Sequence, residues 1–571
     1  MKKAKKLIAL LICMTLFVSV LAGCNPPGST TQTVSEEAAS TAGSSGASTD
    51  TSDAGKAANA DTVASGEKIL RFSQTVEPES MDPQLANSAG TQVILAHVFE
   101  PLIRSVEGET EPAAAESYEM SDDGLTYTFH LREGMTWTDG EPLIAEHYVL
   151  GFQRLVDPNV ASPFAFFGEI VKNGAAINAG EVEVEELGIT APDEMTVEIT
   201  LEYPAAYFLG MLGACNMAPA RADIIEAQGA NYGTSAESNV YCGPFVLSDW
   251  IQNDRVILTK NQDYWNTDEV KLDGVEILYV PEGNTAVAMY EAGDLHYAEV
   301  PVAVISNYPD VEYYYSGAAD YVKLNHREGY DTSSKDLRLA LNYGLNRNEY
   351  ITLATNDVYE ANLRFVLPQV HGVDGEYGTE YPLEFWPADG DMAKAKEHLD
   401  AALKELGLSD PAEIDIELLC ADTDTARTEA EVIQSQWQTN LGITVTIRQV
   451  EYSQRLNMES SFDFEAVLTG WMPDYSDPYT YLELWTTNSV YNHAGYNSKD
   501  YDDAIEAAIA ETDPKARMDL LFQAEETFLN DGVVVPQQLR RVPYIQDTAV
   551  TGFHHYFVGL QHNFVYADIA E

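Results

Sequence analysis

The stretch Ala426–Ile447, ARTEAEVIQSQWQTNLGITVTI, indicates the fold class of this 571-residue chain. Its residues up to Leu441 predict a helix, and Gly442 ends that helix, because glycine is the residue that most often follows the last helical turn. The run Ile443–Ile447 is rich in β-branched residues and predicts a strand. This order of helix, glycine and strand is typical of layered α/β folds.

Elements of both kinds flank this stretch. Upstream, residues 392–406 predict a helix with an apolar face, ended by Gly407. The alternation in Tyr127–Arg132 is typical of a half-buried strand. Further elements are predicted at 69–73, 91–99, 146–155, 321–325, 337–345 and 462–469. Helices and strands therefore alternate along most of the chain, without a fixed-period repeat.

The N-terminus predicts export and lipid anchoring. Four lysines precede the apolar run Leu7–Ala22, which is shorter than the ~20 residues that span a bilayer. The tetrapeptide Leu-Ala-Gly-Cys that ends at Cys24 resembles the lipobox of bacterial lipoproteins, in which the cysteine is acylated. We therefore predict a signal peptide at 1–23 and a lipid anchor on Cys24 at the extracellular face of the cytoplasmic membrane.

The segment after Cys24 predicts a flexible linker. Residues 24–66 are rich in Ser, Thr, Ala and Gly and contain no aromatic residue. Such a composition buries too little apolar surface to offset the entropy of ordering. The rest of the chain is too long for one hydrophobic core and predicts two or three domains.

The charge of the chain excludes one class of partner. Asp and Glu number 91 against 32 Lys and Arg, a net charge of −59. A nucleic-acid partner is excluded, because phosphate binding requires a basic face. Surface solubility is the favoured explanation, and attraction of cations and amines is the alternative.

Residues that carry catalytic or metal chemistry form no known pattern. Cys215, Cys242 and Cys420 are left once the signal peptide and the anchor are set aside; a Cys215–Cys242 bridge stays open. No nucleophile elbow, Walker loop or dinucleotide fingerprint occurs. His554–His555 have no third ligand nearby, so packing is favoured over metal binding. We predict no enzyme, no metal and no cofactor.

Short motifs occur in a characteristic order from about residue 68 to the C-terminus. They include Glu77-Pro78, Phe99–Leu102, Tyr127–Arg132, Trp137–Gly140, Cys242–Phe245 and Gly470–Pro478. Each motif is weak alone, but their shared order is specific. In this order the chain resembles the oligopeptide/dipeptide-binding family, family 5 of the extracellular solute-binding lipoproteins of ABC importers.

The resemblance implies a fold and a function. The implied fold is a two-lobed, hinged periplasmic-binding-protein-like α/β fold with an extra subdomain on the first lobe. The implied boundaries are lobe I at 67–112, 220–315 and 541–571, the extra subdomain at 113–219, and lobe II at 316–540. The implied function is the capture of short peptides between the lobes and their delivery to importer permease subunits by a monomer.

The resemblance also implies a ligand site. In similar proteins the aspartate after Gly-Trp-x-x pairs with the α-ammonium of a peptide, and here that residue is Asp474. An enclosed ammonium needs such a counter-charge. Gly470, Trp471 and Met472 would lie along the ligand backbone. A surface turn is the alternative role for Asp474, and strand packing is the alternative for Trp471.

Two questions stay open at this stage. Some relatives carry an arginine that meets the carboxylate of the ligand two residues before Gly-Trp, but here Leu468 occupies that position; Arg427 and Arg455 are unsupported substitutes. The solute could also be a nickel chelate, haem or oligosaccharide, or the chain could be a peptide-sensing receptor. Asp474 favours a peptide, because an amine-pairing acid is less expected for sugars.

Overall fold

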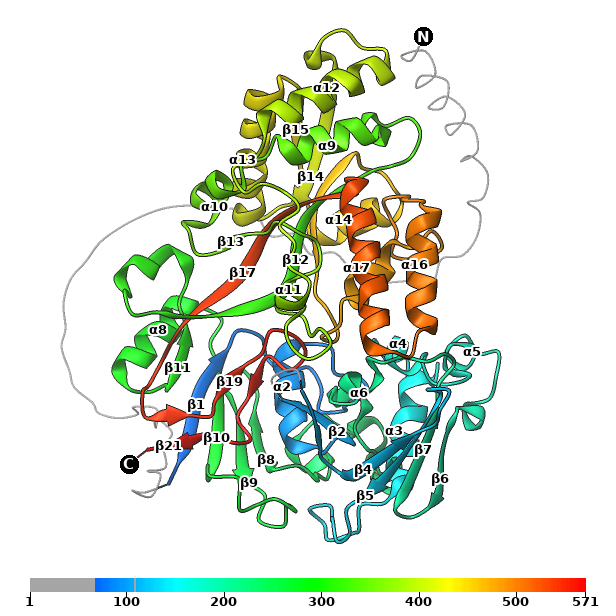
Figure 1. Ribbon diagram of the computed structural model, residues 1–571. Coiled ribbons are helices and arrows are strands. Elements are labelled where there is room, and N and C mark those ends of the chain that lie inside the picture. The colour runs from blue at the N-terminus through cyan, green and yellow to red at the C-terminus, as the bar shows by residue number, and fades with distance from the viewer. Residues whose placement is uncertain (1–66, 107–108, 571) are drawn as a thin grey trace, which may run out of the picture. The chain divides into compact units, whose positions relative to one another are not determined.

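A mixed sheet runs through the residues that this computed structural model describes, 67–106 and 109–570. Counted over those residues, it has eleven strands (Figure 1). Along the sheet they are β15 (Thr444–Val450), β14 (Asp415–Ala421), β16 (Ala466–Trp471), β12 (Glu312–Leu324), β17 (Val534–Gln546), β11 (Tyr297–Glu299), β1 (Ile69–Gln74), β10 (Gly274–Tyr279), β9 (Arg255–Lys260) and β8 (Phe245–Ile251), with β13 (Glu360–Ala361) beside β17.

The two longest strands of the sheet, β12 and β17, are shared by both lobes. Each has 13 residues, and they pair antiparallel. One end of β17 pairs with β11 of lobe I, while β12 pairs with β16 of lobe II. The pairing shifts register between Tyr315 and Ala319 of β12. A bulge bends a strand, so we expect this shift, which lies at the predicted lobe boundary 315/316, to act as the joint between the lobes.

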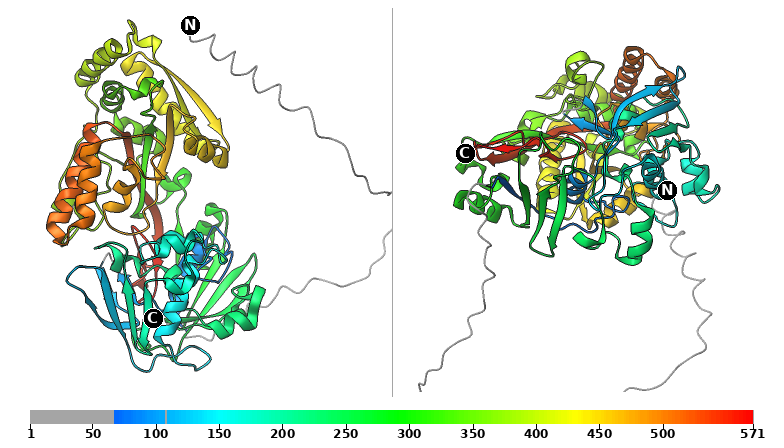
Figure 2. Two further views of the ribbon diagram at one scale, coloured as in Figure 1. Left: turned by 90° about the vertical axis from the view of Figure 1, so that its right-hand side faces the viewer. Right: turned by 90° about the horizontal axis from the view of Figure 1, so that it is seen from below.

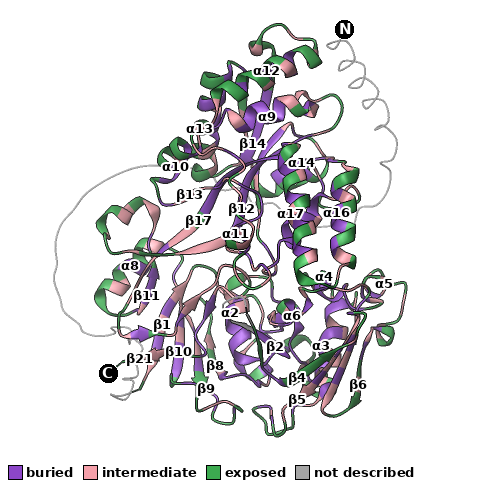
Figure 3. Cartoon of the chain, viewed as in Figure 1, coloured by how far each residue is buried: buried purple, intermediate pink, exposed green. Residues whose placement is uncertain are grey.

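Separate apolar clusters stabilise the two ends of the sheet. The lobe II cluster packs β14, β15 and β16 against α9 (Lys335–Tyr343), α10 (Arg347–Thr355), α12 (Met392–Leu406) and α13 (Asp424–Leu441). The larger cluster contains β1, β8 and β10 with α2 (Ala89–Val98) and extends to α16 (Lys499–Ala510) and α17 (Pro514–Asn530). In Figure 3 the strands are mostly buried, and the outer helix faces are exposed. The predicted α/β fold with two lobes is confirmed.

A second, smaller sheet belongs to the first lobe. Its order is β4 (Ala115–Met120), β5 (Thr126–Leu131), β7 (Thr196–Thr200) and β6 (Ile189–Asp193), and all its pairs are antiparallel. Helix α3 (Ala145–Val156) packs against β6 and β7. The predicted boundaries of the extra subdomain and of both lobes stay predictions; two of them, 315/316 and 540/541, fall inside β12 and β17.

Helix ends follow local sequence signals. Asp391 caps α12, and its carboxylate accepts hydrogen bonds from the backbone N–H groups of residues 393 and 394. Gly407 and Gly442 adopt left-handed conformations after α12 and α13. The predicted helix at 392–406 is therefore confirmed at both ends, and α13 begins two residues before its predicted start because Thr423 caps it.

Other predictions about the chain have mixed outcomes. Within the described residues Cys215, Cys242 and Cys420 are all buried and free, so the open Cys215–Cys242 bridge is not formed. In the same part of the chain no helix is long and apolar enough to cross a membrane. The signal peptide, Cys24 and the linker at 24–66 lie outside the described residues.

A buried ion pair connects α17 to residues 364–366. This segment leads into residues 369–376, which line the cleft described in the next section. α17 lies beside α16, as both views of Figure 2 and their contacts indicate. Glu525 of α17 is fully buried and forms an ion pair with Arg364. Its Oε1 also accepts the backbone N–H groups of Phe365 and Val366, at 3.2 and 2.9 Å. The carboxylate thereby fixes the start of this segment.

We expect Glu525→Gln to destabilise the protein by about 3 kcal/mol, because Arg364 is left buried without a negative charge. Urea unfolding of the variant measures this loss. The neighbouring exposed Glu526→Gln is the matched control and should change stability by less than about 0.5 kcal/mol. Equal effects of the two substitutions would show that the ion pair contributes no stability.

Candidate functional site

A cleft of about 940 Å³ is lined by residues of both lobes. Its size lies near the upper end of the range for ligand pockets. The lining residues lie within 87–104, 164–167, 210–216, 314–316, 369–376, 472–476 and 554–561, with Val542 of β17. Segments far apart in sequence therefore meet around one space beside the joint strands β12 and β17.

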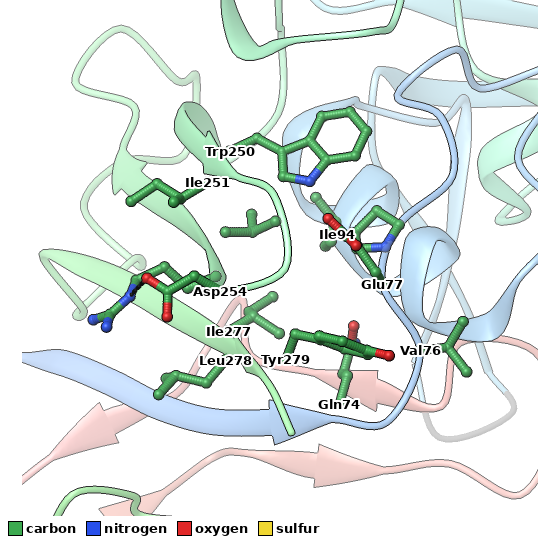
Figure 4. Close-up of a pocket in the computed structure, with 13 residues that line it drawn as sticks. Gln74, Val76, Glu77, Ile94, Trp250, Ile251, Asp254, Ile277, Leu278 and Tyr279 are labelled. Atoms are coloured by element: carbon green, nitrogen blue, oxygen red, sulfur yellow. Dashed lines mark hydrogen bonds and ion pairs between the residues drawn. The ribbon is translucent and has the colours of Figure 1, made fainter. Parts of the chain in front are cut away.

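A second, much smaller crevice lies in lobe I (Figure 4). Its cavity volume is about 10 Å³, enough for one water molecule. Gln74 Oε1 and Trp250 Nε1 line it without a hydrogen-bond partner in the described part of the chain. This crevice is too small for an organic solute, so the larger cleft is the candidate site.

The loop that carries Asp474 is held at its C-terminal end by a buried ion pair. It follows β16 and leads into the short helix α15 (Tyr479–Leu482). Asp477 accepts the backbone N–H of Tyr479 at 2.8 Å and two hydrogen bonds from Arg517 of α17, at 2.8 and 2.9 Å. Ser476 Oγ accepts the backbone N–H of His371 at 2.9 Å. The loop is thus fixed by α17 and by the cleft-lining segment 369–376.

The carboxylate of Asp474 is unneutralised. Among the described residues it has no hydrogen-bond or ion-pair partner, and burial raises its pKa to about 7. Burial likewise raises the pKa of Glu483 to about 8, and the charges of Asp474 and Asp477 add to that rise. Arg517 is the nearby cation, and Asp477 holds it. The cleft therefore contains an acid whose negative charge lacks compensation from the protein.

Aromatic stacking joins the Asp474 loop to the first lobe. Tyr207, in the segment between β7 and α6 (Phe208–Met211), stacks on Tyr475 with ring centroids 4.6 Å apart. It also stacks on Tyr479 at 5.3 Å. These stacked rings pack the loop residues next to Asp474 against the first lobe, and burial is the cause of the raised pKa of Asp474.

The structure brings together part of the predicted site. Met472 and Asp474 both line the cleft, and the side chain of Met472 is exposed. Gly470 and Trp471 lie just outside the lining, opposite Asp320 and Ala319 of β12. The Trp471 ring packs on Tyr491 with centroids 5.4 Å apart, and its Nε1 lacks a partner among the described groups. Ligand contact by these four residues stays a prediction.

The cations considered for a ligand carboxylate lie elsewhere. Leu468 is buried in the lobe II core. Arg427 is exposed and forms an ion pair with Glu431 at 2.9 Å. Arg455 is buried, forms an ion pair with Glu459 at 2.9 Å and donates to Leu468 O. Neither arginine lines the cleft.

The histidines near the C-terminus belong to an aromatic cluster. His555 stacks between Tyr297 and Tyr314, with ring centroids at 4.7 and 5.1 Å. Its Nδ1 lies 2.9 Å from Nδ1 of His562, a hydrogen-bond distance between the two rings. Within the described residues no group of three or more potential metal ligands occurs. His555 and His562 are therefore held by ring packing and one N–H···N hydrogen bond.

Several cleft residues were not predicted from sequence. Arg104, Phe164, Tyr314 and His371 line the cleft from four separate segments, and the segment 554–561 adds a fifth. Arg104 is bound to Glu100 at 2.7 Å. The only local signal was the aromatic run Tyr313–Tyr315, and the other residues reach the cleft through long-range pairing.

The comparisons with known proteins identify the family. The sequence profile described as bacterial extracellular solute-binding proteins, family 5, middle part, matches residues 109–493. The chain belongs to that family. The resemblance inferred from the ordered motifs is thereby confirmed.

Relatives named for different solutes have similar sequence identity to this family 5 protein. The dipeptide-binding protein DppE of Bacillus subtilis is 30% identical over 87% of this chain and 91% of its own length. The probable deoxycholate-binding periplasmic protein YgiS of Escherichia coli is 30% identical over 85% and 89%. The substrate-binding domain of an oligopeptide ABC transporter from Bacillus anthracis has a TM-score of 0.69 and 31% identity, covering 88% of this chain and all of that one.

We expect Asp474→Asn to stabilise the unliganded protein. An acid whose pKa is higher in the folded state makes the protein less stable as the pH rises from its unfolded pKa to its folded pKa. For Asp474 this range runs from about 4 to about 7. The amide avoids this cost, so the gain should be absent at pH 4 and reach roughly 1–3 kcal/mol above pH 7. Thermal unfolding at both pH values measures it.

Asp477→Asn is the matched control, with the same change three positions away. It should destabilise the protein at neutral pH, because Arg517 loses its buried counter-charge. If Asp474→Asn also destabilised at pH 8, the Asp474 carboxylate would have to be compensated within the protein.

Proposed function

We propose that this family 5 protein is the extracellular, lipid-anchored receptor of an ABC importer and captures short peptides by their free amino terminus. The unneutralised carboxylate of Asp474 in the cleft is the observation that carries this proposal. The peptide would lie in the cleft between the lobes, and closure around it would present it to the permease. Catalysis forms no part of the proposed function.

The chemistry of a peptide amino terminus fits the acid. A free α-amino group has a pKa near ~7.8, so it carries a positive charge at neutral pH. Enclosing that charge without a counter-ion is costly, and a fixed carboxylate offsets the cost. Asp474 has no competing cation among the described residues, so the ammonium would be its partner. Met472 and Tyr475 would flank the first peptide unit.

Charge also weighs against the main alternatives. The relative YgiS is named for deoxycholate, which is a bile acid and an anion. An uncompensated carboxylate repels an anion. Neutral oligosaccharides gain nothing from the acid. Haem and nickel chelates carry carboxylates and would also meet repulsion. The dipeptide-binding relative DppE supports the same choice by similarity. A peptide-sensing receptor would use the same site and differs only in its partner.

The anchor and the importer follow from the sequence. Acylation of Cys24 would hold the protein at the membrane surface, and the linker at 24–66 would let the binding unit reach the permease. We propose a monomer at this location. Loss of lipid labelling and release into the medium on Cys24→Ala would be the signs of this anchor.

Two measurements test the peptide assignment. Mass spectrometry of small molecules released by denaturing the purified protein should show short peptides; a bile acid, a sugar or a metal chelate would redirect the assignment. Calorimetry should then show that N-acetylation of a bound peptide weakens its affinity at least ~100-fold, because the ammonium charge is removed.

Asp474→Asn should weaken the free-amine peptide by a similar factor and leave the N-acetylated peptide nearly unaffected. Glu376→Gln is the matched control, since Glu376 is an exposed acid that lines the same cleft. It should retain the preference for the free amine. Tight binding of N-acetylated peptides by the unmodified protein would remove Asp474 from ligand recognition.

A further inference from the structure

We propose that Gly317 is the positioning residue of the amine site, that is, of the Asp474 carboxylate and the part of the cleft around it. This inference rests on the function proposed above. Gly317 lies in β12, inside the register shift that separates the two lobes. Its neighbour Ser316 lines the cleft. The absence of a side chain at this position allows three cleft-lining segments to meet at one point.

Three neighbouring atoms lie too close to Gly317 to leave room for a side chain. A Cβ at this position would lie 2.5 Å from the carbonyl oxygen of Phe557, 2.9 Å from Cγ of Pro473 and 3.0 Å from Cγ2 of Val558. Two of these contacts are too short for carbon, and one partner is a backbone atom that cannot rotate away. Phe557, Val558 and Pro473 all line the cleft. Any residue larger than glycine must therefore displace a wall of the site.

Pro473 makes this displacement specific to the amine site. It directly precedes Asp474, and its ring is closed onto the backbone nitrogen, so a displacement of Cγ beyond what ring puckering absorbs moves the backbone that carries the carboxylate. The loop beyond Asp474 is already held by Asp477 and Arg517. Displacement at Pro473 would thus change the position of Asp474 relative to the cleft without releasing the far end of the loop.

A hydrogen bond holds the other side of the same contact. The hydroxyl of Tyr481 donates to the carbonyl oxygen of Gly317 at 2.9 Å. Tyr481 is fully buried in α15, the helix that follows the Asp474 loop. The joint strand is therefore fixed to the loop on both sides, by Pro473 packing and by Tyr481. Gly317 sets the distance between the strand shared by the lobes and the acid that binds the amine.

The test compares a free-amine peptide with its N-acetylated form, tetra-alanine and N-acetyl-tetra-alanine, by calorimetry at pH 7.5. The ratio of their affinities reports on the placement of Asp474, whereas a general loss of structure lowers both affinities together. For the unmodified protein we expect a ratio of about 100. Gly317→Ala should reduce this ratio at least tenfold while the protein stays folded by circular dichroism.

Gly274→Ala is the matched control. It introduces the same kind of clash, with its Cβ 2.6 Å from the carbonyl oxygen of Leu258, in β10 of lobe I away from the cleft. It should lower stability and keep the ratio within twofold of the unmodified protein. If Gly317→Ala does not fold, Tyr481→Phe removes only the hydrogen bond to Gly317 and should reduce the ratio about threefold.

The outcomes separate the two proposals. An unmodified protein that binds both peptides equally, or neither, overturns the amine site itself and this inference with it. An unmodified protein that discriminates, together with a folded Gly317→Ala variant that discriminates equally well, overturns only the role of Gly317. If Gly317→Ala does not fold, an unchanged affinity ratio in folded Tyr481→Phe likewise overturns only the role of Gly317.

Discussion

The carboxylate of Asp474 is the group on which the rest of this site depends. The arginines near this acid are already paired: Arg517 is bound to Asp477, and Arg104 is bound to Glu100. Asp474 lies partly buried without a hydrogen-bond or ion-pair partner among the described residues, and its pKa rises to about 7. Nearby Glu483, whose pKa rises to about 8, accepts a hydrogen bond from Tyr475. An uncompensated charge of this kind lowers the stability of the unliganded protein, and a cationic ligand restores what is lost. The acid therefore links folding stability to solute chemistry.

The position of that carboxylate depends on the strands that join the lobes. β12 and β17 pair through both halves of the sheet, and their register shifts where Gly317 meets Pro473 and Phe557. The Asp474 loop is thus attached to the joint on one side and to α17 on the other. Membership of family 5 establishes a solute-binding architecture, while relatives of equal identity are named for different solutes. The choice of solute must therefore come from side chains in the cleft, and here charge favours an amine.

Features set by nearby residues could be predicted from sequence, and features set by distant pairing could not. Helix α12 was predicted at both ends because Gly407 stops it locally. The strand expected at 462–469 begins four residues later, at Ala466, because Phe462 takes a left-handed backbone conformation after α14 (Tyr452–Ser460). Strand β17 and the first half of β12 were missed, since both depend on pairing with strands that are distant in sequence. Asp474 was identified by its motif, but Arg517, which holds its loop, lies 40 residues from Asp477 in sequence.

The most direct measurement of the central claim is the number of protons released when a peptide binds at pH 6. Calorimetry in two buffers with different ionisation enthalpies gives this number. At pH 6 a carboxyl with a pKa of about 7 is mostly protonated, whereas the peptide amine is already charged. Formation of the ion pair must then expel most of one proton per peptide bound, and Asp474→Asn must abolish the release. Binding without proton release in the unmodified protein would contradict the account.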